Sequence, residues 1–90
     1  MPNLSIDRVF TLVAATDVEI SPESPQRQYA LVVNDGISDA YLGFGKPGVV
    51  NGSPRLNNGG GNYEINSTNR WHGSLHVISS GTPVITITEW

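Results

Sequence analysis

The chain has 90 residues, a charged fraction of 14%, a formal net charge of −3 and no cysteine. A chain of this length forms one small domain that buries about 60–65% of its unfolded surface, so association with other subunits would stabilise it. The composition excludes disulfides and thiolate metal sites. The five lysines and arginines are scattered along the chain, which argues against nucleic acid as a partner. The sequence contains no run of about 18 apolar residues that would predict a membrane span.

Ten glycines and six prolines, without a long run of helix-forming residues, predict an all-β chain. Turn signals separate about seven strand candidates, a spacing typical of a small antiparallel β-sandwich such as a jelly roll. The strand order stays open. We divide the chain into an N-terminal strand or arm over residues 1–25 and a β-sandwich body over residues 26–90, which together make one domain.

The first strand candidate, residues 5–16, has apolar side chains on both of its faces. Val9 and Val13 fall on one face, and Phe10 and Leu12 fall on the other. A strand of this kind is covered on both sides, and in so small a protein we expect another chain to supply the second cover. A helix would also fit the three-four spacing of several of these residues, but the Thr, Val and Phe content favours a strand.

Residues 17–20 form a short alternating segment, and two prolines in residues 21–25 then break regular structure. The clearest signal follows, in residues 28–44. Alternating residues 28–33 and the apolar run 40–44 predict two strands, joined by an Asn-, Asp-, Gly- and Ser-rich turn as a β-hairpin.

The remaining chain predicts short strands separated by turns. Val49 and Val50 are candidates for a short edge strand within a loop. Further strands are expected at residues 62–65, 70–78 and 84–90, with Tyr63 facing the same way as Ile65, Trp71 the same way as Leu75 and Val77, and Ile85 the same way as Ile87.

Two patterns suggest ligand sites but have simpler explanations. Residues 43–48 match G-x-G-x-x-G, but the sequence that follows, with its proline, cannot form the helix that a dinucleotide site needs. His72 and His76 share a face of the predicted strand, where residues four apart are separated by roughly 13 Å, too far to hold one metal ion. We therefore expect neither a metal site nor a cofactor.

Catalytic patterns are equally weak. Asp35, Asp39 and Glu64 could be considered as paired carboxylates, but the first two fall in the predicted turn, where Asp is favoured for local hydrogen bonds. The serines have no G-x-S-x-G context. The sequence predicts a protein that is not an enzyme.

From residue 28 onward the chain resembles a recurrent small protein encoded among the structural genes of tailed bacteriophages. The resemblance rests on five consecutive segments: YALVVND, AYLGFGKPGV, RLNNGGGNYEI, WHGSLHVISSG and VITITEW. Proteins of this kind are similar in size and character to capsid decoration (cement) proteins. The resemblance implies a β-sandwich on the outer surface of the phage head, made in the host cytoplasm, commonly trimeric, that clamps neighbouring capsomers of the major capsid protein.

Six residues are the predicted interface. In the N-terminal strand we expect contacts from Arg8, Val9, Phe10 and Leu12, and we expect lateral contacts between subunits from Trp71 and Trp90. Many modest contacts of this kind would gain strength from multivalency.

The alternative function is a tail or baseplate module that binds a host-surface glycan. The Asn-rich loop over residues 57–63 would carry that site. The aromatic residues that could stack on a sugar are Tyr41, Tyr63, Trp71 and Trp90, although packing in the core or in an interface is the simpler role for them.

Overall fold

The structure is a computed structural model, and it describes residues 5–90. These residues contain no helix and form eight strands, which confirms the predicted all-β fold. Residues 1–4 of the predicted arm lie outside the described residues. The strands are β1 (Ile6–Thr11), β2 (Val18–Ser21), β3 (Ala30–Asn34), β4 (Ala40–Phe44), β5 (Arg55–Leu56), β6 (Gly61–Ile65), β7 (Leu75–Ile78) and β8 (Val84–Glu89).

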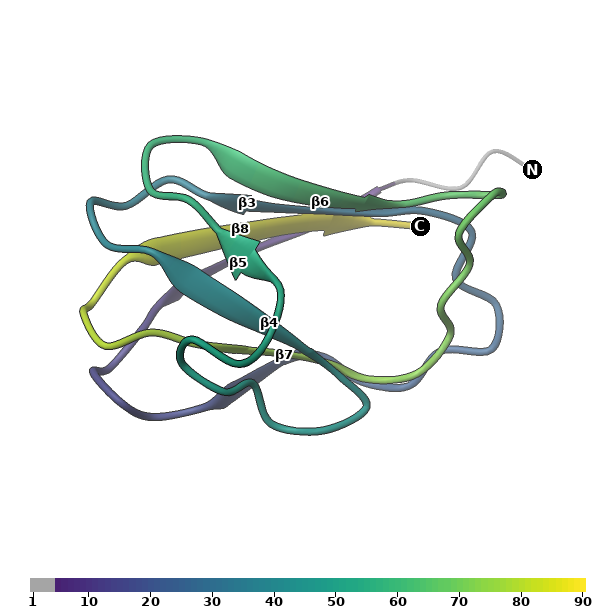
Figure 1. The fold of residues 1–90 in the computed structure, drawn as a ribbon. Helices are drawn as coiled ribbons and strands as arrows, with labels where there is room; N and C mark the ends of the chain where they lie inside the picture. Colours follow the sequence, from purple (N-terminus) through teal and green to yellow (C-terminus); the bar gives the residue numbers. More distant parts are fainter. Residues whose placement is uncertain (1–4) are drawn as a thin grey trace.

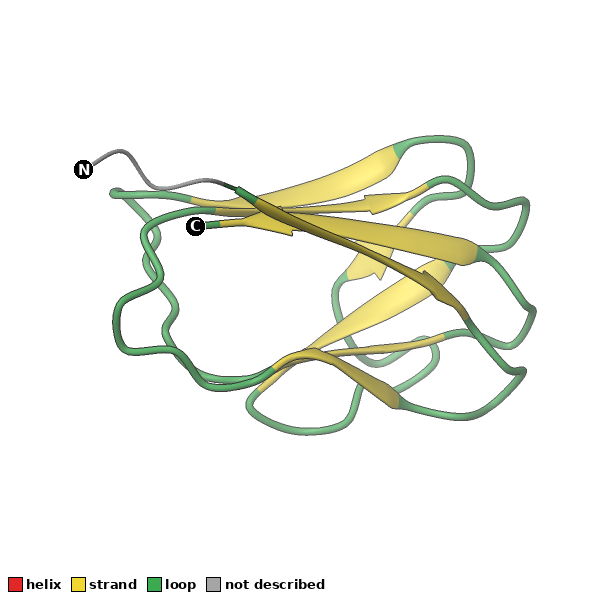
Figure 2. Ribbon diagram, turned by 180° about the vertical axis from the view of Figure 1, so that it is seen from behind, coloured by secondary structure: helices red, strands yellow, loops and turns green. Residues whose placement is uncertain are grey.

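The strands form two antiparallel sheets that face each other as a sandwich (Figure 1). Sheet A has the order β1-β8-β3-β6, and sheet B has the order β2-β7-β4-β5. Most loops gather at the two ends of the sandwich (Figure 2). Residues 5–25 contribute one edge strand to each sheet, so this part of the predicted arm belongs to the same two sheets as the body.

The predicted hairpin between β3 and β4 is wrong, although both strands exist. Strand β3 pairs with β6 and β8, whereas β4 pairs with β5 and β7, so the chain crosses from one sheet to the other between them. The buried side chain of Asn34 explains the crossing. Its Nδ2 donates to the carbonyl oxygens of Ser38 and of Leu56, and Leu56 lies in sheet B. Turn composition predicted a reversal, but these contacts decide that the chain changes sheets.

Three other strand predictions differ from the structure. Strand β1 ends at Thr11 rather than at residue 16, because the backbone N of Thr16 donates to Val13 O in a turn. Strand β7 begins at Leu75 rather than at residue 70, so His72 lies in the preceding loop. Val49 and Val50 do not form a strand, because the carbonyl oxygen of Val49 accepts hydrogen bonds from the backbone of Gly52 and Ser53 in a turn. These segments are short, and local contacts outweigh their β-propensity.

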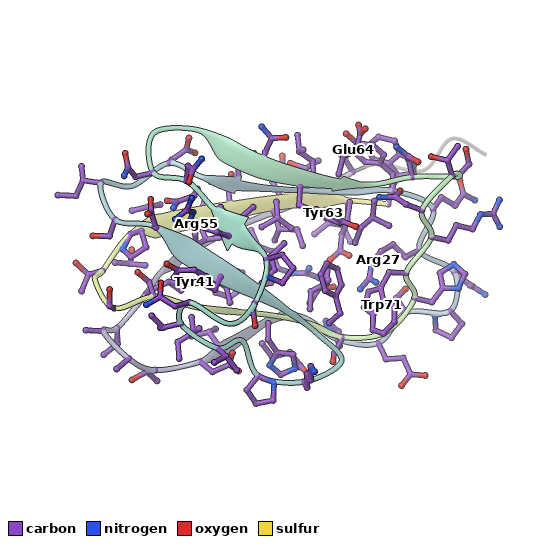
Figure 3. The ribbon with its side chains drawn as sticks, in the orientation of Figure 1. Arg27, Tyr41, Arg55, Tyr63, Glu64 and Trp71 are labelled. Carbon is purple, nitrogen blue, oxygen red and sulfur yellow. The ribbon has the colours of Figure 1, made fainter. Side chains whose placement is uncertain are left out.

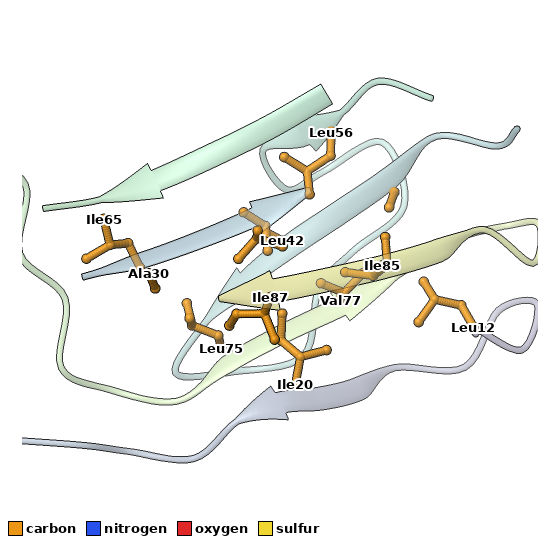
Figure 4. Packing of buried hydrophobic residues seen from close by; sticks show 12 residues of the cluster. Leu12, Ile20, Ala30, Leu42, Leu56, Ile65, Leu75, Val77, Ile85 and Ile87 are labelled. Atoms are coloured by element: carbon orange, nitrogen blue, oxygen red, sulfur yellow. The ribbon is translucent and has the colours of Figure 1, made fainter. Parts of the chain in front are cut away.

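The core lies between the sheets and is built from alternate residues of the central strands (Figure 4). Each fully buried Leu, Ile or Val contributes roughly 1.5–3 kcal/mol relative to an exposed position. The strands therefore pack with one face inward. The core residues are Leu12, Ile20, Ala30, Val32, Ala40, Leu42, Leu56, Ile65, Leu75, Val77, Ile85 and Ile87.

The outer side of sheet B is covered by the loop over residues 45–54, which includes most of the glycine-rich segment. A Cβ at Gly43 would lie 2.1 Å from the carbonyl oxygen of Lys46, and one at Gly48 would lie 2.7 Å from that of Tyr41. The glycines are therefore required for close approach of the loop to β4. Tyr41 on that side is only 7% exposed, and its hydroxyl donates to Oδ1 of Asn51.

Candidate functional site

The outer face of sheet A is a regular surface that the described loops leave uncovered. Alternation along the strands directs Val9 of β1, Leu31 and Val33 of β3, and Val84 of β8 away from the core. The register places Val9 opposite Thr86 on β8, and Thr86 in turn opposite Val33. These side chains therefore form rows that run across neighbouring strands. We call this surface the outer face.

Polar groups frame the outer face on both edge strands. On β1, Oδ1 of Asp7 accepts a hydrogen bond of 2.6 Å from Thr88 Oγ1. On β6, Glu64 lies opposite Leu31, and Figure 3 shows its side chain on the side of the sheet away from the core. The outer face thus mixes apolar and polar side chains, as non-obligate protein–protein interfaces do.

Two stacked aromatic rings mark one end of the outer face. The ring centroids of Tyr29 and Trp90 lie 4.4 Å apart with an interplanar angle of 19°. The backbone holds the pair together, because the carbonyl oxygen of Trp90 accepts hydrogen bonds from Gln28 N and Tyr29 N. Beside the rings lies a pocket of about 440 Å³, whose lining residues are Arg27, Gln28, Tyr29, Asn66, Ser67, Arg70 and Trp90.

Tyr29 is also held by an acidic neighbour. Its hydroxyl donates a hydrogen bond of 2.6 Å to Oε2 of Glu64. This hydrogen bond to a carboxylate raises the pKa of Tyr29. The ring is thus fixed in orientation at both ends, by Trp90 stacking and by Glu64.

A buried ionic cluster joins the two sheets behind this end. The Nε of Arg27 donates to Glu89 at 3.0 Å, and the hydroxyl of Ser21 donates to the same carboxylate at 2.9 Å. The remaining guanidinium donors of Arg27 reach the carbonyl oxygens of Trp71, Gly73 and Pro22 and the hydroxyl of Ser21. Figure 3 shows Arg27 pointing between the sheets towards Trp71.

The carboxylate of Glu89 is held in its charged form. Burial alone raises its pKa, but hydrogen bonds from Arg27, Arg8 and Ser21 outweigh burial and leave the pKa lowered. All guanidinium donors of Arg27 are used within the chain, so this cluster stabilises the fold and is not available to a ligand.

The two histidines lie in different elements, His72 in the loop before β7 and His76 in β7 itself. His76 Nδ1 lies 2.7 Å from Asp17 Oδ2, and Asp17 Oδ1 accepts a hydrogen bond from Gly48 N. The pair thus fastens the loop over residues 45–54 to sheet B. Within residues 5–90 no group of three or more His, Cys, Asp or Glu side chains is placed to hold a metal ion. Of the three carboxylates considered for catalysis, Asp39 accepts a hydrogen bond from Asn58 N, and Glu64 accepts one from the hydroxyl of Tyr29.

The six predicted interface residues have three different environments. Val9 is 68% exposed on the outer face, and Trp90 is 43% exposed at its aromatic end. Leu12, at 1% exposure, lies in the core of its own chain, and Phe10 packs against that core. These two offer little surface to a partner.

The other two predicted residues are committed within the chain. Arg8 is paired with Glu89. Trp71 packs edge-on against Phe44 at a centroid distance of 5.7 Å, and its Nε1 donates to Ser74 O. The structure thus brings Val9 and Trp90 to one face and directs the others elsewhere.

Sequence reasoning missed most of the outer face. The alternation of residues 28–33 contained a usable signal, because Leu31 and Val33 are apolar on one face while Ala30 and Val32 are apolar on the other. It is the same two-faced pattern that pointed to the first strand. No local signal pointed to the Arg27–Glu89 pair, because the two residues are far apart in sequence.

Comparison of the chain with protein-family models, with curated proteins and with solved structures returned no match. In the described part of the chain, no helix has the length and apolar character needed to cross a membrane.

Proposed function

We propose that this protein is a non-catalytic decoration protein of a tailed-bacteriophage head, which binds neighbouring capsomers of the major capsid protein through the outer face. The outer face is the observation that carries the proposal. It combines a regular sheet surface with apolar side chains on three adjacent strands in a very small domain.

The distribution of apolar side chains supports a contact role. Val9, Leu31, Val33 and Val84 lie on three adjacent strands, and no described loop crosses them (Figure 2). Apolar area removed from water contributes about 25 cal/mol per Å². Such a surface gains most when a second protein covers it, and a shell of repeated subunits supplies many equivalent contacts at once.

The rigidity of the surface supports the same role. The outer face lies on strands rather than on loops, and the Arg27–Glu89 cluster behind it joins the sheets. A rigid surface loses little conformational entropy when it docks. It therefore suits a protein that binds a preformed shell.

The direct test is binding of the purified chain to empty, DNA-free capsids of the phage that carries its gene, measured by cosedimentation. The wild type should occupy the capsids to saturation. The double variant Leu31→Lys/Val33→Lys places two charges in the contact, and we expect at least a 10-fold loss of affinity.

The matched control is Ile37→Lys. Ile37 is 94% exposed in the loop between β3 and β4, so this variant replaces an exposed apolar residue with a charge away from the outer face. It should bind as the wild type does. Undiminished binding of the double variant would exclude the outer face as the contact, and absence of wild-type binding would refute the decoration function itself.

A second candidate function, a glycan-binding module of the tail or baseplate, is favoured by the pocket beside Tyr29 and Trp90. The pocket combines an aromatic pair with the amide side chains of Gln28 and Asn66 and the guanidinium of Arg70. Aromatic rings stack on sugars while amides and Arg bind hydroxyl and acidic groups. This location differs from the loop over residues 57–63 that the sequence suggested.

Glycan-array binding by the isolated protein distinguishes the two functions. A glycan-binding module should bind acidic saccharides and lose at least 10-fold in affinity on Arg70→Ala. A decoration protein should bind capsids and leave the array blank.

A further inference from the structure

Among residues 5–90, strand β1 is the least protected of the four edge strands. It spans six residues in an unbroken register with β8. The others are protected in the ways that natural sheets use. The register of β2 shifts between Glu19 and Ser21, β5 has only two residues, and the carbonyl oxygen of Glu64 in β6 accepts a hydrogen bond from the side chain of Asn69.

The open edge of β1 presents the backbone groups of alternate residues. Leu12 N donates to Pro83 O, immediately beyond the pairing of Thr11 with Val84. In an antiparallel ladder the residues that bond the neighbouring strand alternate with those that point away from it. The N–H and C=O groups of Asp7, Val9 and Thr11 therefore point away from β8, towards the open edge.

We propose that β1 pairs antiparallel with β1 of a second copy of this chain, about a two-fold axis at Val9. The outer faces of the two copies then join into one continuous sheet surface. For the two outer faces to form one surface, each residue of β1 must pair with a residue whose side chain points to the same side of the sheet. Odd-numbered residues must therefore pair with odd-numbered residues, and even-numbered with even-numbered ones.

Charge and length select the centre of the pairing. A centre at Val9 places Asp7 opposite the partner's Thr11, and Arg8 opposite the partner's Phe10. A centre at Arg8 or at Asp7 would place two like charges directly opposite, which is destabilising. A centre at Phe10 would leave Asp7 without a partner residue in the strand, because its opposite position lies beyond Thr11, the last residue of β1 in the second copy.

The pairing places the exposed side chain of Val9 against its equivalent and lets the open backbone groups of Asp7, Val9 and Thr11 form hydrogen bonds. The net contribution of each such bond is small, because it replaces a hydrogen bond to water, so the dimer should depend on protein concentration. The proposal requires no capsid and is independent of what the outer face binds. The trimer implied by the resemblance is a different assembly, because a two-fold pairing closes at two copies.

Sedimentation equilibrium of the wild-type chain from about 1 μM to about 1 mM covers the expected range of affinity. We expect the mass to rise from one copy to two. Val9→Pro removes the outward N–H, a change that an edge strand tolerates when that group faces solvent. This variant should stay monomeric across the range, whereas Val9→Thr, which keeps the N–H, should dimerise like the wild type.

A cysteine variant tests the axis and does not depend on the proline variant remaining folded. The natural chain has no cysteine, and hydrogen-bonded cross-strand residues have Cα atoms about 5.5 Å apart, within disulfide range. V9C should form a covalent dimer on mild oxidation at least 10-fold faster than I37C, whose exposed site lies in the loop between β3 and β4. A monomer at every concentration, a mass of three copies, equal crosslinking of the two cysteine variants, or unchanged dimerisation of a folded Val9→Pro variant would each overturn the proposal.

Discussion

The outer sides of the two sheets of this protein differ in how far the chain itself covers them. On sheet B, the loop over residues 45–54 folds back over β4, and the glycines at 43 and 48 permit its close approach. On sheet A, no described loop does the same, and Val9, Leu31 and Val33 remain partly or largely exposed (Figure 1). Within the described residues, apolar side chains on the outer side of a strand are thus covered by the chain itself in sheet B and left without such cover in sheet A.

The difference shows that a strand with two apolar faces does not by itself identify an interface. Strand β4 and strand β3 both carry such a pattern, yet four of the five residues of β4 are buried by the chain itself. What separates them is whether a later segment returns over the strand. Three experiments test this contrast, in order of decreasing expected effect.

Matched truncations on the two outer sides should differ most. Tyr41→Ala removes a buried ring beneath the loop over residues 45–54, and we expect it to lower the free energy of unfolding by about 3 kcal/mol. Leu31→Ala on the outer face should lower it by at most about 1 kcal/mol. Urea denaturation measures both. Equal losses would mean that the two outer sides are covered alike.

The fit of the loop against β4 should be sensitive to a single methyl group. Gly43→Ala pushes Lys46 O, and with it the loop, away from β4. It should lower the free energy of unfolding by about 1–3 kcal/mol, which corresponds to a fall in Tm of about 4–8 °C for each kcal/mol. Gly59→Asn is the control, because a Cβ at Gly59 meets nothing within 4 Å and Asn tolerates its positive φ. A normal Tm for Gly43→Ala would show that the loop does not press on β4.

The ionic cluster that joins the sheets should give the smallest effect, seen as pH dependence. Because the pKa of Glu89 is lowered in the folded state, the unfolded state takes up its proton first as the pH falls. Stability from this group is therefore present above its ordinary pKa of 4.5 and is lost as the pH falls through the lower, folded value. Thermal melts from neutral to acidic pH should show a smaller fall in Tm for Glu89→Gln than for the wild type. Parallel curves for the two proteins would contradict this assignment.

The sequence predictions that were confirmed depend on neighbouring residues, whereas the hairpin prediction, whose outcome depends on contacts between distant residues, was wrong. Alternation in β3 and β8 and the apolar run of β4 predicted where strands lie, because the side-chain period of a strand is a local property. The hairpin prediction failed because Asn34 is held by Ser38 and by Leu56, and its second partner is distant in sequence. Of the candidate interface residues, the pattern alone could not separate Val9, which points outward, from Leu12, which points into the core.

The sequence by itself determined that the chain is all-β, where most of its strands lie and which residues alternate within each of them, since these follow from backbone geometry and residue type. Only the tertiary structure decided which sheet each strand joins, which apolar face is covered by the chain's own loop, and that Arg27 meets Glu89 between the sheets. These outcomes depend on contacts between distant segments, whose free energy no local pattern contains.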